Sequence, residues 1–214
     1  MKTATKPLES RTTHSFATKE LSSHTWSDFE KLFSKYNGVW GGCWCMFYHG
    51  QGSFPLGKGK TPKNRKDEKR KLVSENRSHG IIVYDGMTPV GWCQYGVSEE
   101  LPRIQTSRTY NKVAPKLDGR SGRLWRVTCF FIDKDYRGKG VASTALKSAL
   151  NSIKQEGGGT VEAYPVATMD SLPRKSSSGK ASFLWSGTVS MFEREGFKVV
   201  AELGRSRRLV RASI

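Results

Sequence analysis

The stretch that decides the fold runs from Thr128 to Ala142 and reads TCFFIDKDYRGKGVA. Its first part belongs to the apolar run Leu124–Ile132, which has the length and composition of a buried strand. Its end opens an amphipathic segment whose apolar stripe is Val141, Ala145, Ala149 and Ile153. The polar, glycine-containing residues 133–140 therefore predict a tight connection from a strand into a helix.

This connection has the features of an anion-binding site. The first N–H groups of a helix have no partner inside the helix and carry the positive end of its dipole. A pyrophosphate docks there when the chain can approach closely. Gly138 and Gly140 remove side chains that would block the approach, while Arg137 and Lys139 add positive charge. A short Gly-x-Gly is weak by itself, and no third glycine completes a dinucleotide fingerprint.

The remaining sequence predicts alternating helices and strands around this connection. In chain order we expect a short strand at Thr13–Ala17, a helix from Thr25 or Ser27 to Asn37-Gly38, a strand at Val39–His49, a polar surface helix at Arg65–Arg77, a hairpin of Gly80–Tyr84 and Pro89–Tyr95, the strand and helix already described, a strand at Thr160–Val166, a helix ending near Glu195, and a closing hairpin of Phe197–Leu203 and Leu209–Ser213. Strand, helix and strand at this spacing imply one right-handed parallel crossover.

The predicted fold class is therefore α/β (α+β), with a mixed, mostly antiparallel sheet flanked by helices. We expect a polar lead-in over residues 1–24 and one domain over 25–214, with a basic insertion at 50–77. The 214 residues are 36% hydrophobic, which suffices for a packed core. Because no apolar run has the roughly 20 residues of a membrane helix and the start lacks a secretory signal, we expect a cytoplasmic protein without membrane contact.

The formal net charge of +17 is the strongest compositional signal. The basic residues gather in two runs, Lys58–Lys71 and Arg205–Arg211. Such charge implies an anionic partner or a very basic surface. Nucleic acid, a multiply phosphorylated cofactor and a merely soluble surface all fit, and composition does not choose among them.

The four cysteines lie among apolar or aromatic neighbours. Cys43, Cys45 and His49 could be imagined as metal ligands, but zinc sites usually show longer gaps and a second ligand cluster, which the sequence lacks. We therefore expect buried or pocket-lining thiols and no metal.

The quoted stretch resembles the acyl-CoA signature of the GNAT superfamily of N-acetyltransferases: a hydrophobic strand, a polar turn, then Arg or Gln-x-x-Gly-x-Gly or Ala. Arg137, Gly140 and Ala142 match this signature in register. Met191–Phe197, MFEREGF, is similar to the family's late helix ending in Gly-Phe. The segments CWCM, YPV and SMFER further resemble a bacterial subgroup of the family with no assigned acceptor.

The resemblance implies a single-domain GNAT fold in which Thr128–Ile132 splays from Val161–Val166 and opens a slot for acetyl-CoA. In that family the pantetheine bonds to strand backbone, an N–H near Phe131 would polarise the thioester carbonyl, and the pyrophosphate rests on the glycine-containing turn. The cofactor-binding residues expected on this basis are Phe130, Phe131, Ile132, Arg137, Gly138, Lys139, Gly140, Val141 and Ala142.

The proton-transfer residues of the family are not visibly in place. Relatives often carry a tyrosine four residues before the Gly-Phe pair, where it protonates the CoA sulfur, and this chain has Phe192 there. Tyr164 and Ser190 are the candidate replacements, and each also suits a structural role. Without another acid, the leaving thiolate would take its proton from water.

The sequence also leaves more than one candidate for the general base that deprotonates the amine. Many relatives place a glutamate on the first slot strand, and Leu124–Ile132 contains no carboxylate. Glu162 or Asp133 could act through a water, and Glu162 could instead be a solvated strand residue. Cys129 could suggest a covalent acyl-enzyme, but the sequence shows no histidine partner for it, so a packed thiol is favoured.

The acceptor is the least determined feature. An aromatic set suits either an acceptor pocket or the core: Trp40, Trp44, Phe47, Tyr48, Trp92, Tyr95 and Tyr164. We expect an N-acetyltransferase moving an acetyl group from acetyl-CoA to a primary amine of a small molecule by direct attack. The alternatives are a protein- or RNA-directed enzyme using Lys58–Lys71, and a non-catalytic CoA-binding module. Nucleic acid is not the favoured partner, and a homodimer is left open.

Overall fold

The computed structural model describes residues 15–50, 61–117, 119–168 and 184–214. The first half of the chain forms β1 (Ala17–Glu20), α1 (Trp26–Ser34), α2 (Pro62–Ser74), β2 (His79–Asp85) and β3 (Thr88–Val97). The second half forms α3 (Arg108–Val113) between the 3-10 helices Pro102–Thr106 and Ala114–Lys116, then β4 (Leu124–Ile132), the 3-10 helix Lys134–Tyr136, α4 (Val141–Gln155), β5 (Thr160–Ala163), α5 (Val189–Glu193), β6 (Lys198–Leu203) and β7 (Arg207–Ser213).

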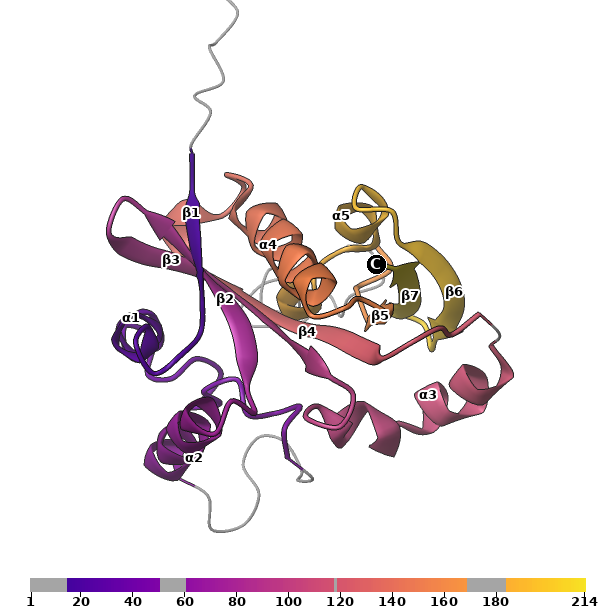
Figure 1. Ribbon diagram of the computed structural model, residues 1–214, viewed down its shortest axis with the longest axis horizontal. Helices are drawn as coiled ribbons and strands as arrows, with labels where there is room; N and C mark the ends of the chain where they lie inside the picture. Colours follow the sequence, from indigo (N-terminus) through magenta and orange to yellow (C-terminus); the bar gives the residue numbers. More distant parts are fainter. Residues whose placement is uncertain (1–14, 51–60, 118, 169–183) are drawn as a thin grey trace, which may run out of the picture.

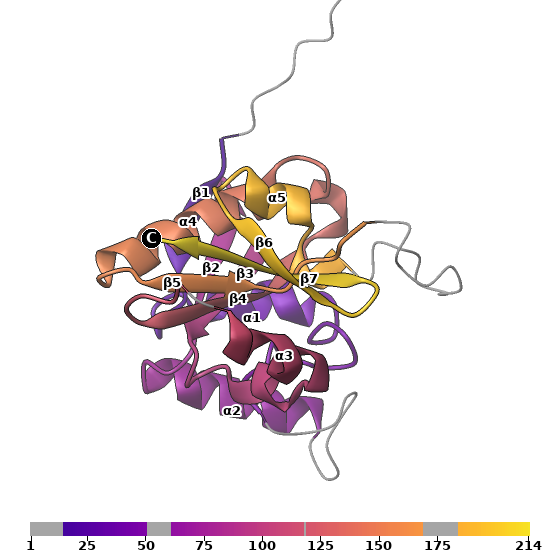
Figure 2. The ribbon, with the colours of Figure 1, turned by 90° about the vertical axis from the view of Figure 1, so that its right-hand side faces the viewer.

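Within these residues seven strands form one sheet in the order β1-β2-β3-β4-β5-β7-β6. Neighbouring strands are antiparallel except β4 and β5, which α4 connects and which run parallel. Helices α4 and α5 cover one face of the sheet, and α1, α2 and α3 lie on the other (Figures 1 and 2). The mixed, mostly antiparallel sheet with a single parallel crossover is confirmed.

The parallel pair separates part of the way along β4. The two strands are in register from Leu124 opposite Thr160 to Val127 opposite Ala163, where β5 ends. β4 continues to Ile132, whereas the chain after β5 forms isolated bridges from Val166 to Thr188 and Arg207. The strand expected at Thr160–Val166 is thus shorter than predicted. Among the described residues, the edge of 128–132 that faces away from β3 has no strand partner.

A bulge in β4 changes which side chains face α4. Pairing with β3 steps from Gln94 opposite Cys129 to Tyr95 opposite Val127, so Thr128 is the extra residue. Trp125 and Val127 lie in the α4 core, and after the bulge Phe130 does so too. Cys129 and Phe131 instead pack against the α1 core. The bulge therefore reorients β4 at the point where it leaves β5.

The α1 side of the sheet has an aromatic core. Trp26, Phe29, Leu32 and Phe33 recur at helical spacing and are all buried. The Phe29 ring lies 4.8 Å from that of Trp92 on β3, edge to face. This packing fixes α1 and the chain that follows it against the end of β4.

The strand expected at Val39–His49 is wrong. These residues form turns, and the backbone is left-handed from Asn37 to Gly42 (φ between 49° and 80°) and again at Trp44 and Cys45. Val39 at φ 58° is strained, because a β-branched residue rarely adopts this region. The prediction rested on the high apolar and aromatic content of this segment, which is also typical of a strand. Gly38, Gly41 and Gly42 instead let the chain reverse its direction.

The basic helix α2 lies at the surface, as its composition predicts, but it also has a buried stripe that the composition does not show. Thr61 caps it, accepting a hydrogen bond from the Asn64 N–H at 3.2 Å, so the helix begins before Arg65. Arg65 and Lys69 are buried together with Val73, and the Lys69 side chain is 0% exposed. None of the helices in the described part of the chain is long and apolar enough to span a membrane.

Candidate active site

A cleft of about 840 Å³ opens where β4 leaves β5. Its floor is the end of β4, one wall is the turn into α4, and the opposite wall is the segment before α5. Eight of the expected cofactor-binding residues line it: Phe130, Phe131, Ile132, Arg137, Gly138, Gly140, Val141 and Ala142. Lys139, the ninth, is exposed outside this lining, with its Nζ 5.1 Å from the Tyr136 ring.

The turn into α4 is shaped by its two glycines. Gly138 has φ 75° and Gly140, the residue before the helix, has φ 87°. A Cβ at either position would meet no protein atom within 4 Å, so backbone conformation rather than packing requires glycine. The first helical bond is from Thr144 N to Gly140 O at 3.0 Å. The N–H groups of residues 141–143 are thus left for a ligand, as an anion site needs.

The edge of β4 also presents backbone groups to the cleft. The Asp133 N–H donates to Val90 O on β3 at 2.9 Å. Strand alternation directs the Phe131 N–H to the same side and the Phe130 and Ile132 N–H groups to the opposite side, which is the cleft. An extended chain such as pantetheine can pair with these two residues. The residues present therefore fit a ligand that carries both a pantetheine chain and a pyrophosphate, because backbone N–H donors lie at both ends of the turn.

Asp133 fastens this turn to α1 and the residues that follow. Its carboxylate accepts from Lys35 Nζ at 2.6 Å, the Tyr36 hydroxyl at 2.8 Å and the Asp135 N–H at 3.1 Å. Burial opposes ionisation, but the bonds from Lys35, Asp135 and Tyr36 outweigh it, and the pKa of Asp133 lies below its ordinary value. A carboxylate held in this way is a weak base and a good anchor.

Glu162, the candidate base, is 0% exposed and does not line the cleft. Its Oε1 accepts from Arg211 Nε at 2.9 Å, and its Oε2 from the hydroxyls of Tyr110 at 2.8 Å and Tyr164 at 3.2 Å. It is thus not a solvated strand residue. Both carboxylate oxygens have partners within the protein, which is the arrangement that a buried charge requires.

The two candidate acids lie apart from each other. Tyr164 is buried and donates to Glu162, and burial raises the pKa of its hydroxyl well above the ordinary value. Ser190 is exposed, with its hydroxyl 3.2 Å from that of Thr188. Neither lines the cleft, whereas Thr188 does. Thr188 also caps α5, accepting from the Met191 N–H at 3.3 Å.

Phe192 occupies the position where relatives carry a tyrosine, and it belongs to the core. It is 0% exposed, and its ring lies 5.1 Å from that of Phe197 and 6.1 Å from that of Phe130. Its neighbours Met191 and Gly187 line the cleft instead. The ring thus supports the β4 floor from beneath.

A second, smaller chamber adjoins the cleft. It has a volume of about 320 Å³ and shares Trp40 and Trp185 with the cleft. Its lining is almost wholly apolar: Trp40, Cys43, Cys45, Phe47, Tyr48, Gln94, Cys129 and Trp185. Of the predicted aromatic set, Trp40, Phe47 and Tyr48 thus line a chamber, while Trp44, Trp92, Tyr95 and Tyr164 are core.

Several of the residues that line these spaces were not predicted from the sequence. Tyr36, Thr188 and Trp185 line the cleft but lie outside the family's motifs. Only the aromatic, glycine-rich character of residues 38–48 signalled a special loop, and its left-handed backbone carries Trp40, Cys43 and Cys45 to the chamber.

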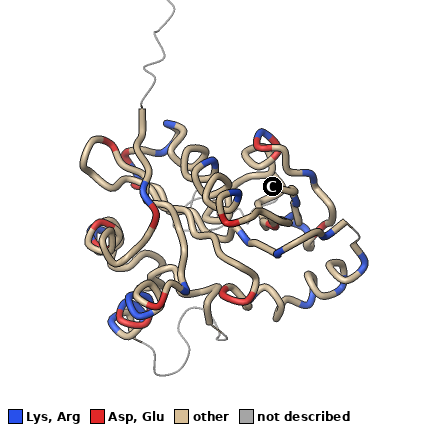
Figure 3. The backbone as a smooth tube through the Cα atoms, in the orientation of Figure 1, with Lys and Arg blue, Asp and Glu red and all other residues tan. Residues whose placement is uncertain are grey.

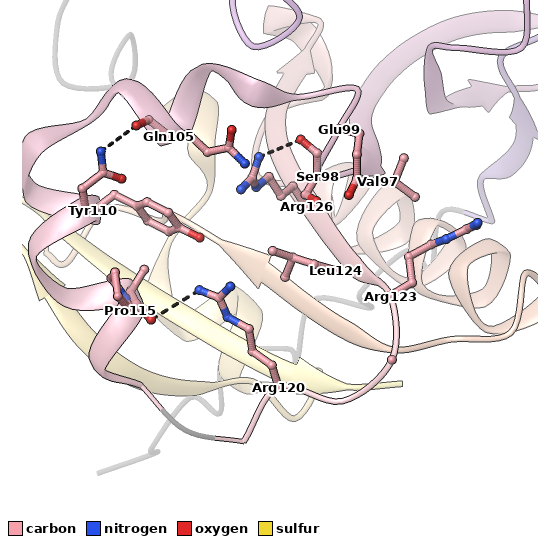
Figure 4. A pocket seen from close by; sticks show the side chains of 13 residues that line it. Val97, Ser98, Glu99, Gln105, Tyr110, Pro115, Arg120, Arg123, Leu124 and Arg126 are labelled. Atoms are coloured by element: carbon pink, nitrogen blue, oxygen red, sulfur yellow. Dashed lines mark hydrogen bonds between the residues drawn. The ribbon is translucent and has the colours of Figure 1, made fainter.

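A further cavity of about 880 Å³ lies at the other end of β4 (Figure 4). Three arginines line it, Arg120, Arg123 and Arg126. Arg126 is 1% exposed and donates through Nη1 to the carbonyls of Ser98 at 2.9 Å and Leu101 at 2.7 Å. It serves to hold the surrounding loops, and the whole length of β4 separates this cavity from the glycine-containing turn.

The family model described as "Acetyltransferase (GNAT) family" matches residues 25–171. Among solved structures, the chain is similar to mosquito arylalkylamine N-acetyltransferase like 5b, with 11% identity, coverage of 94% of this chain and 100% of that one, and a TM-score of 0.53. It is also similar to an N-acetyltransferase from Staphylococcus aureus Mu50, with 13% identity, coverage of 94% and 98%, and a TM-score of 0.49.

None of the curated proteins compared with the chain shows significant similarity to it. At such low identities the likeness to the mosquito structure shows a shared fold alone. The family model, however, spans more than half of the chain, including the splayed strand and the glycine-containing turn. The chain therefore belongs to the GNAT family of acetyltransferases, whose acetyl donor is acetyl-CoA.

Proposed function

We propose that the protein is an N-acetyltransferase that moves an acetyl group from acetyl-CoA to a primary amine of a small molecule. The observation that carries the proposal is the junction of two spaces with different chemistry. The cleft offers backbone N–H groups and Arg137 to an anionic, extended ligand, and the chamber beside it offers an apolar, aromatic lining. Trp40 and Trp185 line both, so two ligands can meet there.

In this proposal the eight expected residues that line the cleft hold the donor, and Lys139 adds positive charge beside them. The free N–H groups at the start of α4 and Arg137 bind its pyrophosphate, and Phe130 and Ile132 pair with its pantetheine. A backbone N–H of this edge stabilises the oxygen that becomes negative during acyl transfer. Transfer follows direct attack by the amine while both ligands are bound.

The chamber also defines the acceptor. Among the described residues no carboxylate lines it, so an amine that enters loses solvation as a cation and is driven toward the neutral, nucleophilic form. A planar apolar body suits the faces of Trp40, Phe47 and Trp185. We therefore infer an amine with an aromatic or bulky aliphatic body. Of Glu162, Tyr164 and Ser190, none lines the cleft or the chamber, so we assign Glu162 and Tyr164 to holding β5 in place.

The basic run is less suited to RNA than its composition suggests. Lys58 and Lys60 lie outside the described residues. Figure 3 shows acidic residues interspersed on α2, where Lys63 pairs with Asp67 at 2.7 Å and Lys66 pairs with Glu30. Lys69 is buried. Much of the run is thus engaged within the protein, which favours the small-molecule reading over a nucleic-acid surface.

The test is release of free thiol from acetyl-CoA over a panel of acceptors. We expect 2-phenylethylamine to be used with a lower KM than 1,4-diaminobutane, a basic peptide or RNA, because only its body matches the chamber. The preference is contradicted if the diamine or a macromolecule is the better substrate. An enzyme that binds CoA but acetylates no member of the panel would instead support a binding module.

The donor site has an internal control. Gly140→Ala and Gly157→Ala both place a Cβ in open space at positive φ, 87° and 93°, at opposite ends of α4. Each is expected to lose about 1 kcal/mol of stability. Only Gly140→Ala should weaken CoA binding, measured by calorimetry, because its Cβ enters the anion site. Equal CoA affinities in the two variants would contradict the assignment.

A further inference from the structure

The chamber holds three of the protein's four cysteines, Cys43, Cys45 and Cys129. Cys43 and Cys45 come from the left-handed loop after α1, and Cys129 comes from β4. Cys129 lies directly opposite Gln94 in the sheet, and the Cys45 thiol is 3.5 Å from Gln94 Oε1, so both thiols adjoin the same side chain. The described residues contain no group of three or more His, Cys, Asp or Glu side chains arranged for a metal ion.

Cys45 differs from the other cysteines in its bonding. The Trp92 Nε1–H donates to its sulfur at 3.1 Å, and Trp92 is 0% exposed. A sulfur that receives an N–H bond in a buried site is better suited to negative charge than one surrounded by carbon. Its own S–H is 3.5 Å from Gln94 Oε1, which Thr128 also contacts at 3.0 Å.

A buried ammonium lies behind the same tryptophan. Lys69 Nζ is 5.4 Å from the centre of the Trp92 ring and donates to Ser78 Oγ at 2.6 Å. The other atom beside it is His49 Nε2 at 3.3 Å. His49 Nδ1 donates to Glu100 O at 2.9 Å, so Nε2 is an acceptor and the ring is neutral. Burial and the Lys69 charge hold the pKa of His49 well below its ordinary value.

In the described part of the chain, no carboxylate forms an ion pair with Lys69. A thiolate at Cys45 is the anion that the site can supply. Burial raises the pKa of the Cys45 thiol, but the bond with Cys129, the Lys69 charge and the Trp92 bond outweigh it, and the net direction is downward. Burial raises the pKa of Cys43 and Cys93, and the bond with Cys45, together with burial, raises that of Cys129.

We propose that Cys45 is an oxidation site, at which hydrogen peroxide entering the chamber forms a sulfenic acid that Cys129 captures as a disulfide. In the first step the thiolate attacks a peroxide oxygen, the O–O bond breaks, and hydroxide leaves. In the second, the Cys129 sulfur displaces hydroxide from the sulfenic sulfur, and that hydroxide takes up a proton to leave as water. Sulfur is oxidised and peroxide reduced, so no other oxidant is needed.

The chamber selects for a small oxidant. Cys45 is 4% exposed, and its access runs between aromatic side chains. Peroxide is close to water in size, whereas alkylating reagents are bulkier. The product bond would tie the loop after α1 to β4 inside the space that we assign to the amine. The expected loss of activity rests on the proposed function, whereas the oxidation itself does not.

The test treats the reduced full-length protein with hydrogen peroxide and then unfolds it in urea, so that bulkier trapping reagents reach the chamber thiols. Residual thiols are blocked with N-ethylmaleimide, and the products are mapped by mass spectrometry. We expect a loss of two hydrogens and a Cys45–Cys129 linked peptide. Cys129→Ser should stop at the sulfenic acid, which gains one oxygen and is trapped by a dione reagent. Cys45→Ser should form neither product, while Cys43→Ser, altered in the same chamber, should oxidise as the parent does. Lys69→Met should slow the reaction about tenfold.

A disulfide or sulfenic acid at Cys43 or Cys93, or equal oxidation in Cys45→Ser, overturns the proposal. CoA binding is measured on the reduced and oxidised samples by calorimetry. Because no cysteine lines the cleft, we expect equal CoA affinity in both and loss of amine acetylation only in the oxidised one. Reduced protein that fails to bind CoA would contradict the proposed function, whatever the thiol result.

Discussion

Glu162 shows how a single side chain can belong to the architecture of a site rather than to its chemistry. Its carboxylate lies on the parallel strand beside the splay, is 0% exposed, and joins Arg211 on β7 to the hydroxyls of Tyr110 and Tyr164. It thereby links α3, β5 and β7 beneath the point where β4 and β5 separate. The sequence pointed to Glu162 as a base because the first slot strand lacks the glutamate that many relatives carry, but it could not show the bond from Arg211.

Glu162→Gln should therefore destabilise the fold and spare the chemistry. Removing the charge deprives the buried Arg211 guanidinium of the Glu162 carboxylate, which costs about 3 to 5 kcal/mol. Urea unfolding should show this loss, whereas Ser190→Ala, at an exposed hydroxyl, should change the free energy of unfolding by less than about 0.5 kcal/mol. Turnover per folded molecule should stay within a few-fold of the parent. A stable but inactive Glu162→Gln enzyme would make Glu162 the base.

Phe192→Tyr tests whether the missing family tyrosine limits the reaction. Phe192 packs between Phe130 and Phe197 and does not line the cleft, so the new hydroxyl enters an apolar core. We expect a loss of about 1 to 3 kcal/mol of stability and an unchanged kcat. Phe29→Tyr, equally buried in the α1 core, is the matched control for the stability loss. A tenfold rise in kcat would show that the hydroxyl reaches the sulfur and that proton supply was limiting.

At the scale of elements, the position of α4 depends on one small residue of β3. A Cβ at Gly91 would overlap the Val141 side chain at the start of α4. This contact was not predictable from the sequence, because a glycine inside a strand does not reveal what lies over it. This close approach determines how near the start of α4 lies to the sheet. It therefore also determines where the N–H groups of the anion site are positioned.

Gly91→Ala should accordingly displace the start of α4 and weaken CoA binding about tenfold. Gly80→Ala is the control, since a Cβ there would overlap the Trp92 side chain on the opposite face of the sheet. Both variants should lower the melting temperature, but only Gly91→Ala should change CoA affinity in a calorimetric titration. Unchanged affinity in Gly91→Ala would mean that the helix start adjusts independently of β3.

The elements that the sequence predicts best are those with a single dominant period. β4 was expected at the residues where it is found, and α4 begins at Val141 as its stripe indicates, because a buried strand and an amphipathic helix leave clear patterns. The strand predicted at residues 39–49 was wrong for a physical reason. Left-handed turns leave no hydrophobic period in the sequence, and aromatic residues that line a chamber resemble the residues of a strand. The glycine-containing turn was found by motif, but the chamber required tertiary structure.

Helix α2 illustrates a buried charge that sequence patterning hides. Burial lowers the pKa of Lys69 from 10.5 to about 8. Because the unfolded chain holds this proton up to its higher pKa, the cost of burial is fully present below pH 8 and is relieved as the pH rises from about 8 to 10.5. The free energy of unfolding attributable to Lys69 should therefore increase over that range.

Lys69→Met removes the titration and keeps most of the volume. Urea unfolding at several pH values should show a difference between parent and variant that grows in the parent's favour above pH 8, by up to about 3 kcal/mol. Lys63→Met on the exposed face of the same helix is the control and should give a constant difference. A flat difference for Lys69→Met would mean that the lysine is neutral throughout or is paired in both states.

In the molecule as a whole, the two ligand spaces lie side by side at one end of β4 and share Trp40 and Trp185. The cleft lies at the start of α4 and is also lined by Tyr36 and Trp40, while the chamber lies toward the loop after α1. The two meet at the splayed end of β4, where strand backbone inside the sheet is open to a ligand from the side. A bulge, an early strand end and a left-handed loop thus act together to make one reaction site.

The net charge of +17 attracts CoA, which is strongly anionic. Part of its binding energy is long-range attraction, so raising the salt concentration from about 50 to 500 mM should weaken CoA binding several-fold. Arg137→Gln should reduce both the affinity and the salt dependence, because Arg137 lines the cleft. Arg123→Gln, at the cavity on the far end of β4, should lower the net charge equally and leave the affinity nearly unchanged. If both substitutions act alike, the attraction comes from the overall charge rather than from the turn, and Arg137 has no special role in holding the pyrophosphate.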